Sequence, residues 1–434
     1  MSQSGSKLQR SLKSRHILMM ALGGAIGAGI FKGSSSSIDL AGPGVVFPYL
    51  VGGLILLVVM RSLALMAVKN DKATTLKDLI EPILGPFAGY VVGWIYWLDW
   101  VLVMAAETAA ASSFLQFWFP GVPLWTLALI VSIVMTLLNL LQVRIYGETE
   151  YWLAAVKIVT LILFVVFGII LIITRFSGHT VAHNLVGHGG LFPHGLAGLV
   201  SAMLVVMFSF GGIEMVGMTL GETDGPAKVI PKAARSVIFR ILLFYILPIA
   251  IILCLVPWNG LGTAQSPFVT VFQQIGIPYV GGVMNFVLLT AVLSAVNSGM
   301  YATSRMLYTQ ALDGQAPGGF AKLSRWHVPV RALMFSTIFL YVGVIVAVFA
   351  KGNTFGDLMV IPGYTVMIVW MLLVLARIKQ EGIRPTTIVS LLALLAIFIG
   401  VIITTPAAGT IVSFIAIAII VISFLFVKRG QLEA

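Results

Sequence analysis

Apolar runs about as long as a bilayer is thick recur along the whole sequence. A helix needs about 20 mostly apolar residues to cross the hydrocarbon core. Because only 9% of the residues are charged, against roughly 25% in soluble domains, a water-soluble core cannot hide this surface. The sequence therefore predicts an all-α polytopic membrane protein. Twelve transmembrane helices are expected, over residues 17–38, 41–67, 87–117, 124–142, 150–175, 196–221, 236–256, 279–310, 331–350, 354–376, 385–404 and 408–428.

Lysine and arginine residues between the apolar runs predict how the chain is oriented. With the N-terminus in the cytoplasm, 22 of the 26 fall at cytoplasmic ends or loops, as expected of residues that resist translocation. We therefore expect both termini in the cytoplasm and a multi-pass protein of a bacterial cytoplasmic membrane. The net charge of +11 is divided among short clusters, so no nucleic-acid partner is expected. The four exceptions are Lys32, Lys157, Arg175 and Lys351.

The connecting segments are short, and none could form an independent folded core. An enzyme with a catalytic head is therefore not expected, and neither is a membrane-embedded one, because acids and histidines do not cluster at one membrane face. A metal site is conceivable in the loop at 176–195, but solvated histidines are the preferred interpretation, so no cofactor or metal is expected. The histidines of this loop are His179, His183, His188 and His194.

Two glycine-rich segments interrupt the first and sixth expected helices, at residues 23–29 and 208–214. Each glycine weakens a helix by up to about 1 kcal/mol. Close helix packing is one explanation; a broken helix that lines a cavity is the other. Since the breaks open two halves of five helices each, they indicate an inverted-repeat transporter, where freed amides bind an anionic group and freed carbonyls a cation. An α-amino acid is the simplest molecule that carries both.

Four ionisable residues lie inside expected helices: Asp99, Glu107, Lys157 and Glu214. A charge at a helix centre costs about 2.5–3.5 kcal/mol on insertion scales. Lys157 either extends to the membrane surface or is a buried amine that alternates between charged and neutral forms and carries a proton. Glu214 adjoins the second glycine segment, which favours a functional role over a structural hydrogen bond. Asp99 and Glu107 are eight residues apart and share a helix face.

Several longer motifs accompany these residues. They are Gly23 to Phe31 with Gly33-Ser34 and Ala41-Gly42-Pro43, Glu150 to Lys157, Phe208 to Glu214, Gly221-Glu222-Thr223 through Ile230-Pro231-Lys232-Ala233, and Ser294 to Tyr301 with Ser304 to Tyr308. In these motifs the sequence resembles the amino acid–polyamine–organocation (APC) superfamily, and within it the bacterial amino acid transporter (AAT) permeases. The resemblance runs from about residue 8 to 380.

The resemblance implies a LeuT-like fold: two inverted five-helix repeats whose helices 1 and 6 are broken, plus two C-terminal helices. The expected parts are a cytoplasmic segment at 1–16, the repeats at 17–175 and 196–376, two additional helices at 385–428 and a cytoplasmic tail at 429–434. It also implies site residues. The substrate would meet Ile26, Gly27, Ala28, Gly29, Phe208, Ser209, Gly211, Gly212 and Ile213. Proton coupling would involve Lys157 and Glu214. Accessory residues would be Glu107, Ser294 and Ser298.

Two departures from the family pattern stand out. Ala28 replaces the usual threonine or serine, and Leu65 replaces a carboxylate of helix 2. The leading hypothesis is a secondary active transporter that imports an α-amino acid, expected to be neutral, together with a proton by alternating access. The partners would be the amino acid, the proton and the lipid bilayer. An amino acid exchanger with the same site and a non-transporting amino acid sensor remain alternatives.

Overall fold

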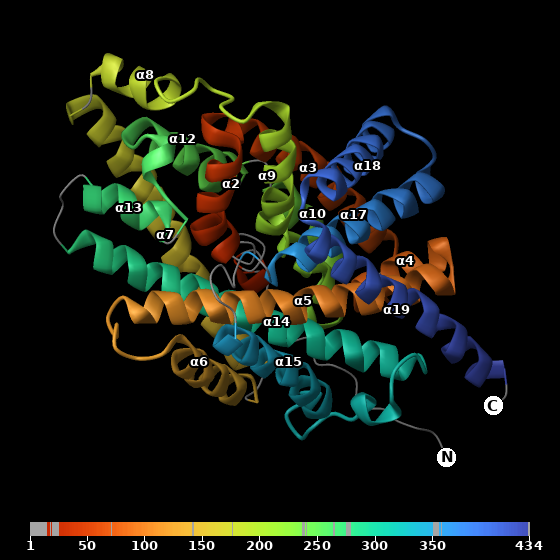
Figure 1. Cartoon of the computed structure of the whole chain (residues 1–434). Coiled ribbons are helices and arrows are strands. Elements are labelled where there is room, and N and C mark those ends of the chain that lie inside the picture. The colour runs from red at the N-terminus through yellow and green to blue at the C-terminus, as the bar shows by residue number, and fades with distance from the viewer. Residues whose placement is uncertain are drawn as a thin grey trace.

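The computed structural model describes residues 15–17, 19, 26–70, 72–140, 143–175, 177–236, 239, 241–263, 265–274, 279–349, 356 and 358–432. These residues form helices and connecting turns, and no β-strand occurs among them. Two long helices, α5 (Pro86–Gln116) and α14 (Val280–Leu312), run side by side through the middle of the molecule (Figure 1). The remaining helices pack around this pair, and we call α5 and α14 the central helices.

The other helices follow the apolar pattern of the sequence. They are α2 (Ser34–Ala41), α3 (Val46–Lys69), α4 (Leu76–Leu84), α6 (Leu124–Asn139), α7 (Val143–Arg175), α8 (Gly178–Val186), α9 (Gly195–Phe210), α10 (Pro226–Arg235), α12 (Leu247–Leu255), α13 (Pro267–Gln274), α15 (Val330–Phe349), α17 (Val360–Glu381), α18 (Pro385–Thr404) and α19 (Ala407–Leu432). Short π- and 3₁₀-helical turns join several of them, including η1 (Gly29–Gly33), η3 (Ile213–Met218) and η5 (Leu242–Ile246).

Eight helical stretches of the described chain are long and apolar enough to cross a membrane. One of them, Gly29–Lys69, contains residues 29–38 of the first expected helix and all of the second, joined by a 3₁₀ turn. Shorter apolar helices lie where the fourth, seventh and ninth were expected, over Leu124–Asn139, Leu243–Leu255 and Val330–Tyr341. The polytopic all-α fold is therefore confirmed, although the count by length differs from twelve.

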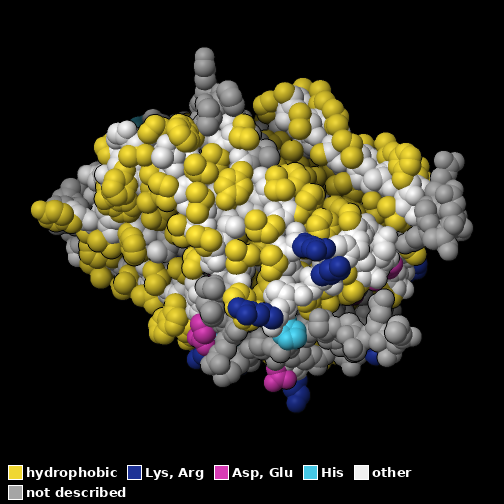
Figure 2. All heavy atoms as spheres, turned by 90° about the horizontal axis from the view of Figure 1, so that it is seen from below, with side chains coloured by type: hydrophobic (Ala, Val, Ile, Leu, Met, Phe, Trp, Pro, Cys, Tyr) yellow, Lys and Arg dark blue, Asp and Glu magenta, His cyan; other side chains and the backbone are white. Residues whose placement is uncertain are grey.

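Burial separates an inner set of helices from an outer one. In α5, 72% of the most apolar window is buried inside the protein, whereas only 22% of α18 and 11% of α19 are. Helices that are apolar on nearly every side suit a lipid environment. Figure 2 shows such a surface: hydrophobic side chains cover most of the face, and the coloured charged side chains lie toward its lower part.

Four segments expected as loops contain helices, one of them the 222–235 segment with α10. The 68–86 segment forms α4, which begins with a capping box between Thr75 and Asp78. The 176–195 segment forms α8, where Ser177 Oγ accepts a hydrogen bond of 3.2 Å from the Thr180 amide. The 257–278 segment contains α13. Because N-terminal caps satisfy amides that a short helix leaves free, α4 and α8 form without the long apolar run that marks a spanning helix.

Candidate functional site

The first helix break lies at Ile26 and Gly27, which are not helical; helical structure resumes at Ala28 and continues through η1. Gly23, Gly24 and Ala25 of the same motif lie outside the described residues. Here the backbone amide of Ala28 donates to both carboxylate oxygens of Glu107, at 2.9 and 3.0 Å. A helix start leaves amides without partners, and this carboxylate from α5 satisfies one of them. A Cβ atom on Gly27 would lie 2.5 Å from Glu107 Oε1, so the carboxylate approaches because this residue has no side chain.

The second break ends α9 at Phe210. Gly211 is extended, with ψ of 147°, and Gly212 has φ of +96°, a conformation that favours glycine. The chain then continues as η3. The amide of Gly212 donates to Glu214 Oε1 at 3.0 Å, and the indole of Trp370 donates to Glu214 Oε2 at 3.3 Å. Glu214 therefore caps the break of its own segment and ties it to α17.

The two breaks meet at Gly29 and Ser209. A Cβ atom on Gly29 would lie only 2.6 Å from the Cα atom of Ser209, so the backbones are in direct contact. The Ser209 carbonyl accepts from the Tyr245 hydroxyl at 3.0 Å, and its side chain donates to the Val205 carbonyl at 2.7 Å. Segments 180 residues apart in sequence are thus held together by a close glycine contact.

A small, narrow cavity lies at this meeting point. Its lining includes six of the nine substrate-binding residues expected from the sequence, and Glu107. Ile26, Ala28 and Ile213 are buried beside it without lining it. The described residues that line it are Gly27, Gly29, Asp99, Trp100, Val103, Glu107, Phe208, Ser209, Gly211, Gly212, Ala295, Pro362 and Val366.

Asp99 is one lining residue that the expected site did not contain. Its carboxylate is buried and accepts a hydrogen bond of 2.7 Å from the Thr365 hydroxyl of α17. The eight-residue spacing to Glu107, about 12 Å of helix, was the signal that could have found it. The sequence contains no comparable signal for Pro362 and Val366 of α17, because only packing determines which face of that helix lines the cavity.

Lys157 of α7 is fully buried, so its side chain does not extend to the surface. Its Nζ donates to Ser294 Oγ of α14 at 2.9 Å. The Ser294 hydroxyl in turn donates to Glu150 Oε1 at 2.5 Å. The buried hydroxyl of Ser298, one turn along α14, has no hydrogen-bond partner among the described residues. The buried amine thus belongs to a polar cluster between α7 and α14, next to the cavity that Glu107 lines.

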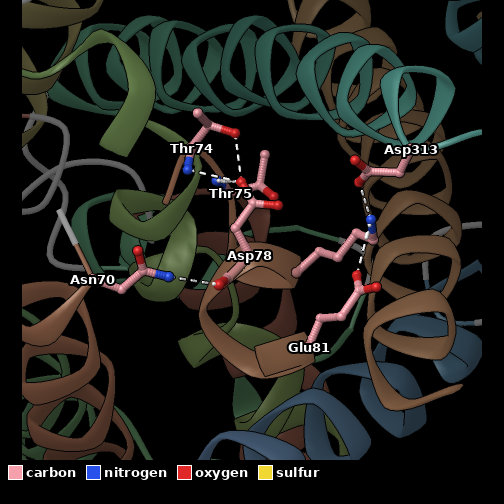
Figure 3. Close-up of polar contacts among 7 residues, drawn as sticks. Asn70, Thr74, Thr75, Asp78, Glu81 and Asp313 are labelled. Atoms are coloured by element: carbon pink, nitrogen blue, oxygen red, sulfur yellow. Dashed lines mark hydrogen bonds and ion pairs between the residues drawn. The ribbon is translucent and has the colours of Figure 1, made fainter. Parts of the chain in front are cut away.

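A second polar cluster holds α4 in place. The amides of Thr74 and Thr75 donate to Asp78 at 2.8 and 3.0 Å, and the buried amine of Lys77 bridges Glu81 and Asp313. Figure 3 shows Asp78 pointing to the two threonines and the Glu81 and Asp313 carboxylates converging on one nitrogen atom. Asp313 directly follows α14, so Lys77 links α4 to the end of α14, one of the two central helices.

The part of the chain that the structure describes contains no group of three or more histidine, cysteine, aspartate or glutamate side chains arranged to hold a metal ion. In α8 and the turn after it, the rings of His183 and His188 lie 5.0 Å apart, edge to face. His194 packs instead against Trp258. His194 is therefore engaged apart from the pair formed by His183 and His188.

The model of the amino acid permease family matches residues 16–430. The chain belongs to this family. An uncharacterised amino acid permease of Bacillus subtilis is 48% identical over 99% of both chains. A gamma-aminobutyric acid permease of the same species is 41% identical over 88% of this chain and 82% of the other. An aromatic amino acid transport protein of Escherichia coli is 40% identical over 87% and 83%.

A solved structure shows the same fold. The crystal structure of MhsT in complex with L-phenylalanine matches with a TM-score of 0.66, covering 92% of this chain and all of that one, at 15% identity. The LeuT-like architecture expected from the sequence is therefore confirmed, and so is membership of the APC superfamily. The protein is a multi-pass membrane transporter of a permease family and not an enzyme.

Proposed function

We propose that this permease imports a neutral α-amino acid together with a proton, by alternating access, across the cytoplasmic membrane of a bacterium. The observation that carries the proposal is the meeting of two broken helices around one cavity, with a buried amine beside it. The charge distribution along the sequence supports an orientation with both termini in the cytoplasm.

The cavity offers both halves of a zwitterion a partner. Amide groups at the start of the first helical segment, other than the Ala28 amide that Glu107 already occupies, would receive the carboxylate, as helix N-termini do for anions. Carbonyl groups at the end of α9 would receive the ammonium. Trp100, Val103, Phe208 and Val366 give the cavity an apolar wall against which an uncharged side chain would pack. The names of two relatives, for gamma-aminobutyric acid and aromatic amino acids, agree with a substrate of no net charge.

Lys157 would carry the coupling proton. A buried amine without charge compensation is costly, whereas one that exchanges its proton during each cycle can link substrate binding to proton movement. Glu214 would also take part in proton coupling during the transport cycle, because it links the second break to α17 through Trp370. Lys77, Glu81 and Asp313 lie at the end of the protein that contains α4. Alternating access would require the contacts of Lys77 with Glu81 and Asp313 to break when this end opens.

The proposal is tested with purified protein in liposomes that have an imposed pH gradient, using each of the twenty amino acids as a labelled substrate. We expect at least one neutral amino acid to accumulate when the outside is acidic, and the accumulation to collapse when a protonophore is added. Absence of gradient-driven accumulation for all twenty would refute proton-coupled import. Uptake only into liposomes preloaded with substrate would identify an exchanger, and binding without uptake a sensor.

Asp99 favours a second candidate, an amino acid with an additional cationic group. This buried carboxylate lines the cavity and makes no ion pair of 4.0 Å or less with a described residue. Competition of lysine, arginine and ornithine against a neutral labelled substrate separates the two candidates. If a basic amino acid competes best and Asp99→Asn removes that advantage, the second candidate replaces the first.

A further inference from the structure

Glu150 lies in the first half of α7, about two turns before Lys157, and it is fully buried. It belongs to the sequence motif that ends at the lysine, yet neither the cavity nor the helix breaks involve it. In the described part of the chain its carboxylate contacts no arginine or lysine closely enough to form an ion pair. A buried acid of this kind requires an explanation beyond packing.

Its contacts form a continuous hydrogen-bonded path to Lys157. The amine donates to Ser294 Oγ at 2.9 Å, and the same hydroxyl donates to Glu150 Oε1 at 2.5 Å. A hydroxyl can accept and donate at once, so Ser294 joins a proton donor to a proton acceptor. All three side chains are completely buried, which leaves bulk water no part in the path.

Two asparagines position the acid. Asn297 Nδ2 donates to the other carboxylate oxygen, Glu150 Oε2, at 3.4 Å, and Asn139 Nδ2 donates to Asn297 Oδ1 at 2.9 Å. These contacts hold Glu150 Oε1 toward Ser294. Asn139 ends α6 and is partly exposed, so the network extends from the buried lysine toward the end of the helix bundle.

We propose that Glu150 receives the proton that Lys157 releases during transport, with Ser294 as the bridge. In this step Lys157 Nζ gives a proton to Ser294 Oγ while Ser294 gives its own hydroxyl proton to Glu150 Oε1. The ammonium becomes a neutral amine, the carboxylate becomes a carboxylic acid, and the serine is unchanged. This inference rests on the proposed proton coupling.

The direction of the path fits import. In the proposed orientation the start of α7 faces the cytoplasm, and Glu150 lies seven residues, about 10 Å of helix, closer to that side than Lys157. The path would therefore deliver protons inward. Other charged groups near this path are Glu107 of α5, which interacts electrostatically with Lys157, and Glu148 of α7, which contacts Arg15 and His16 of the N-terminal segment.

The test measures proton influx and substrate uptake in the same proteoliposomes, with a pH-sensitive dye inside. The substrate is the amino acid, of the twenty, that the wild type accumulates most. Glu150→Gln keeps an acceptor oxygen for Ser294 but takes up no proton. We expect its proton influx per substrate to fall at least about fivefold, with substrate affinity within about twofold of the wild type. Glu148→Gln, on the same helix but outside the path, is the matched control and should keep the wild-type ratio.

A second pair of variants covers the case in which Glu150→Gln does not fold. Ser294→Thr keeps the bridging hydroxyl and should retain coupling, whereas Ser294→Ala removes it and should lose coupling while still binding substrate. An unchanged proton-to-substrate ratio in Glu150→Gln or Ser294→Ala would overturn the relay. A wild type that accumulates substrate without proton influx would instead overturn the proposed coupling itself, and the relay with it.

Discussion

Both helix breaks are stabilised by a buried carboxylate, but the two carboxylates come from different distances along the chain. At each break a buried carboxylate accepts a hydrogen bond from a backbone amide that the interrupted helix has left free. Glu107 reaches its amide from another helix, 79 residues away in sequence, whereas Glu214 reaches an amide only two residues away. The first break is therefore tied to the position of α5, and the second is largely self-contained. Substitutions at the two carboxylates should differ accordingly.

The largest effect is expected for Glu107→Ala. This change leaves the buried Ala28 amide without its acceptor, which costs about 1–3 kcal/mol, and removes the tie between the first break and α5. We expect substrate affinity to fall at least about 30-fold in a binding measurement on purified protein. Glu107→Gln, which keeps one acceptor oxygen, is the control and should lose less than about tenfold. Equal losses in both variants would show that charge, and not the amide contact, is what matters.

Gly29→Ala comes next and tests whether the two breaks must touch. The new methyl group would lie 2.6 Å from the Ser209 Cα atom, and since backbone cannot rotate away as a side chain does, the segments must separate. Overpacking typically costs about 1–3 kcal/mol, so initial uptake rates should fall about tenfold. In Gly282→Ala the nearest atom is 3.7 Å away, and this variant should transport normally. Normal uptake by Gly29→Ala would contradict the close contact.

Glu214→Gln should have the smallest effect of the three. The amide side chain can still accept from the Gly212 amide through its oxygen, and the break keeps its own glycine geometry. We expect substrate affinity to change about threefold or less. A loss as large as that of Glu107→Ala would mean that the second break also depends on distant contacts, through Trp370, and that the comparison is wrong.

Much of this architecture could be predicted because it depends on local sequence. Apolar length marks the spanning helices, and glycine pairs mark the break at Gly211 and Gly212. The bond between Glu107 and the Ala28 amide could not be predicted, because it depends on how two distant helices pack. For the same reason the contribution of α17 to the cavity, through Pro362 and Val366, had no sequence signal. The short helix α4 was missed because it lacks a long apolar run.

Lys157 provides the most direct test of proton-coupled import. The measurement compares wild type and Lys157→Ala in liposomes, recording both accumulation driven by a pH gradient and exchange of labelled for unlabelled substrate at equal pH. The account predicts that the variant loses accumulation above the external concentration but still exchanges substrate, because the cavity between the two breaks is intact. Undiminished gradient-driven accumulation by Lys157→Ala would contradict it.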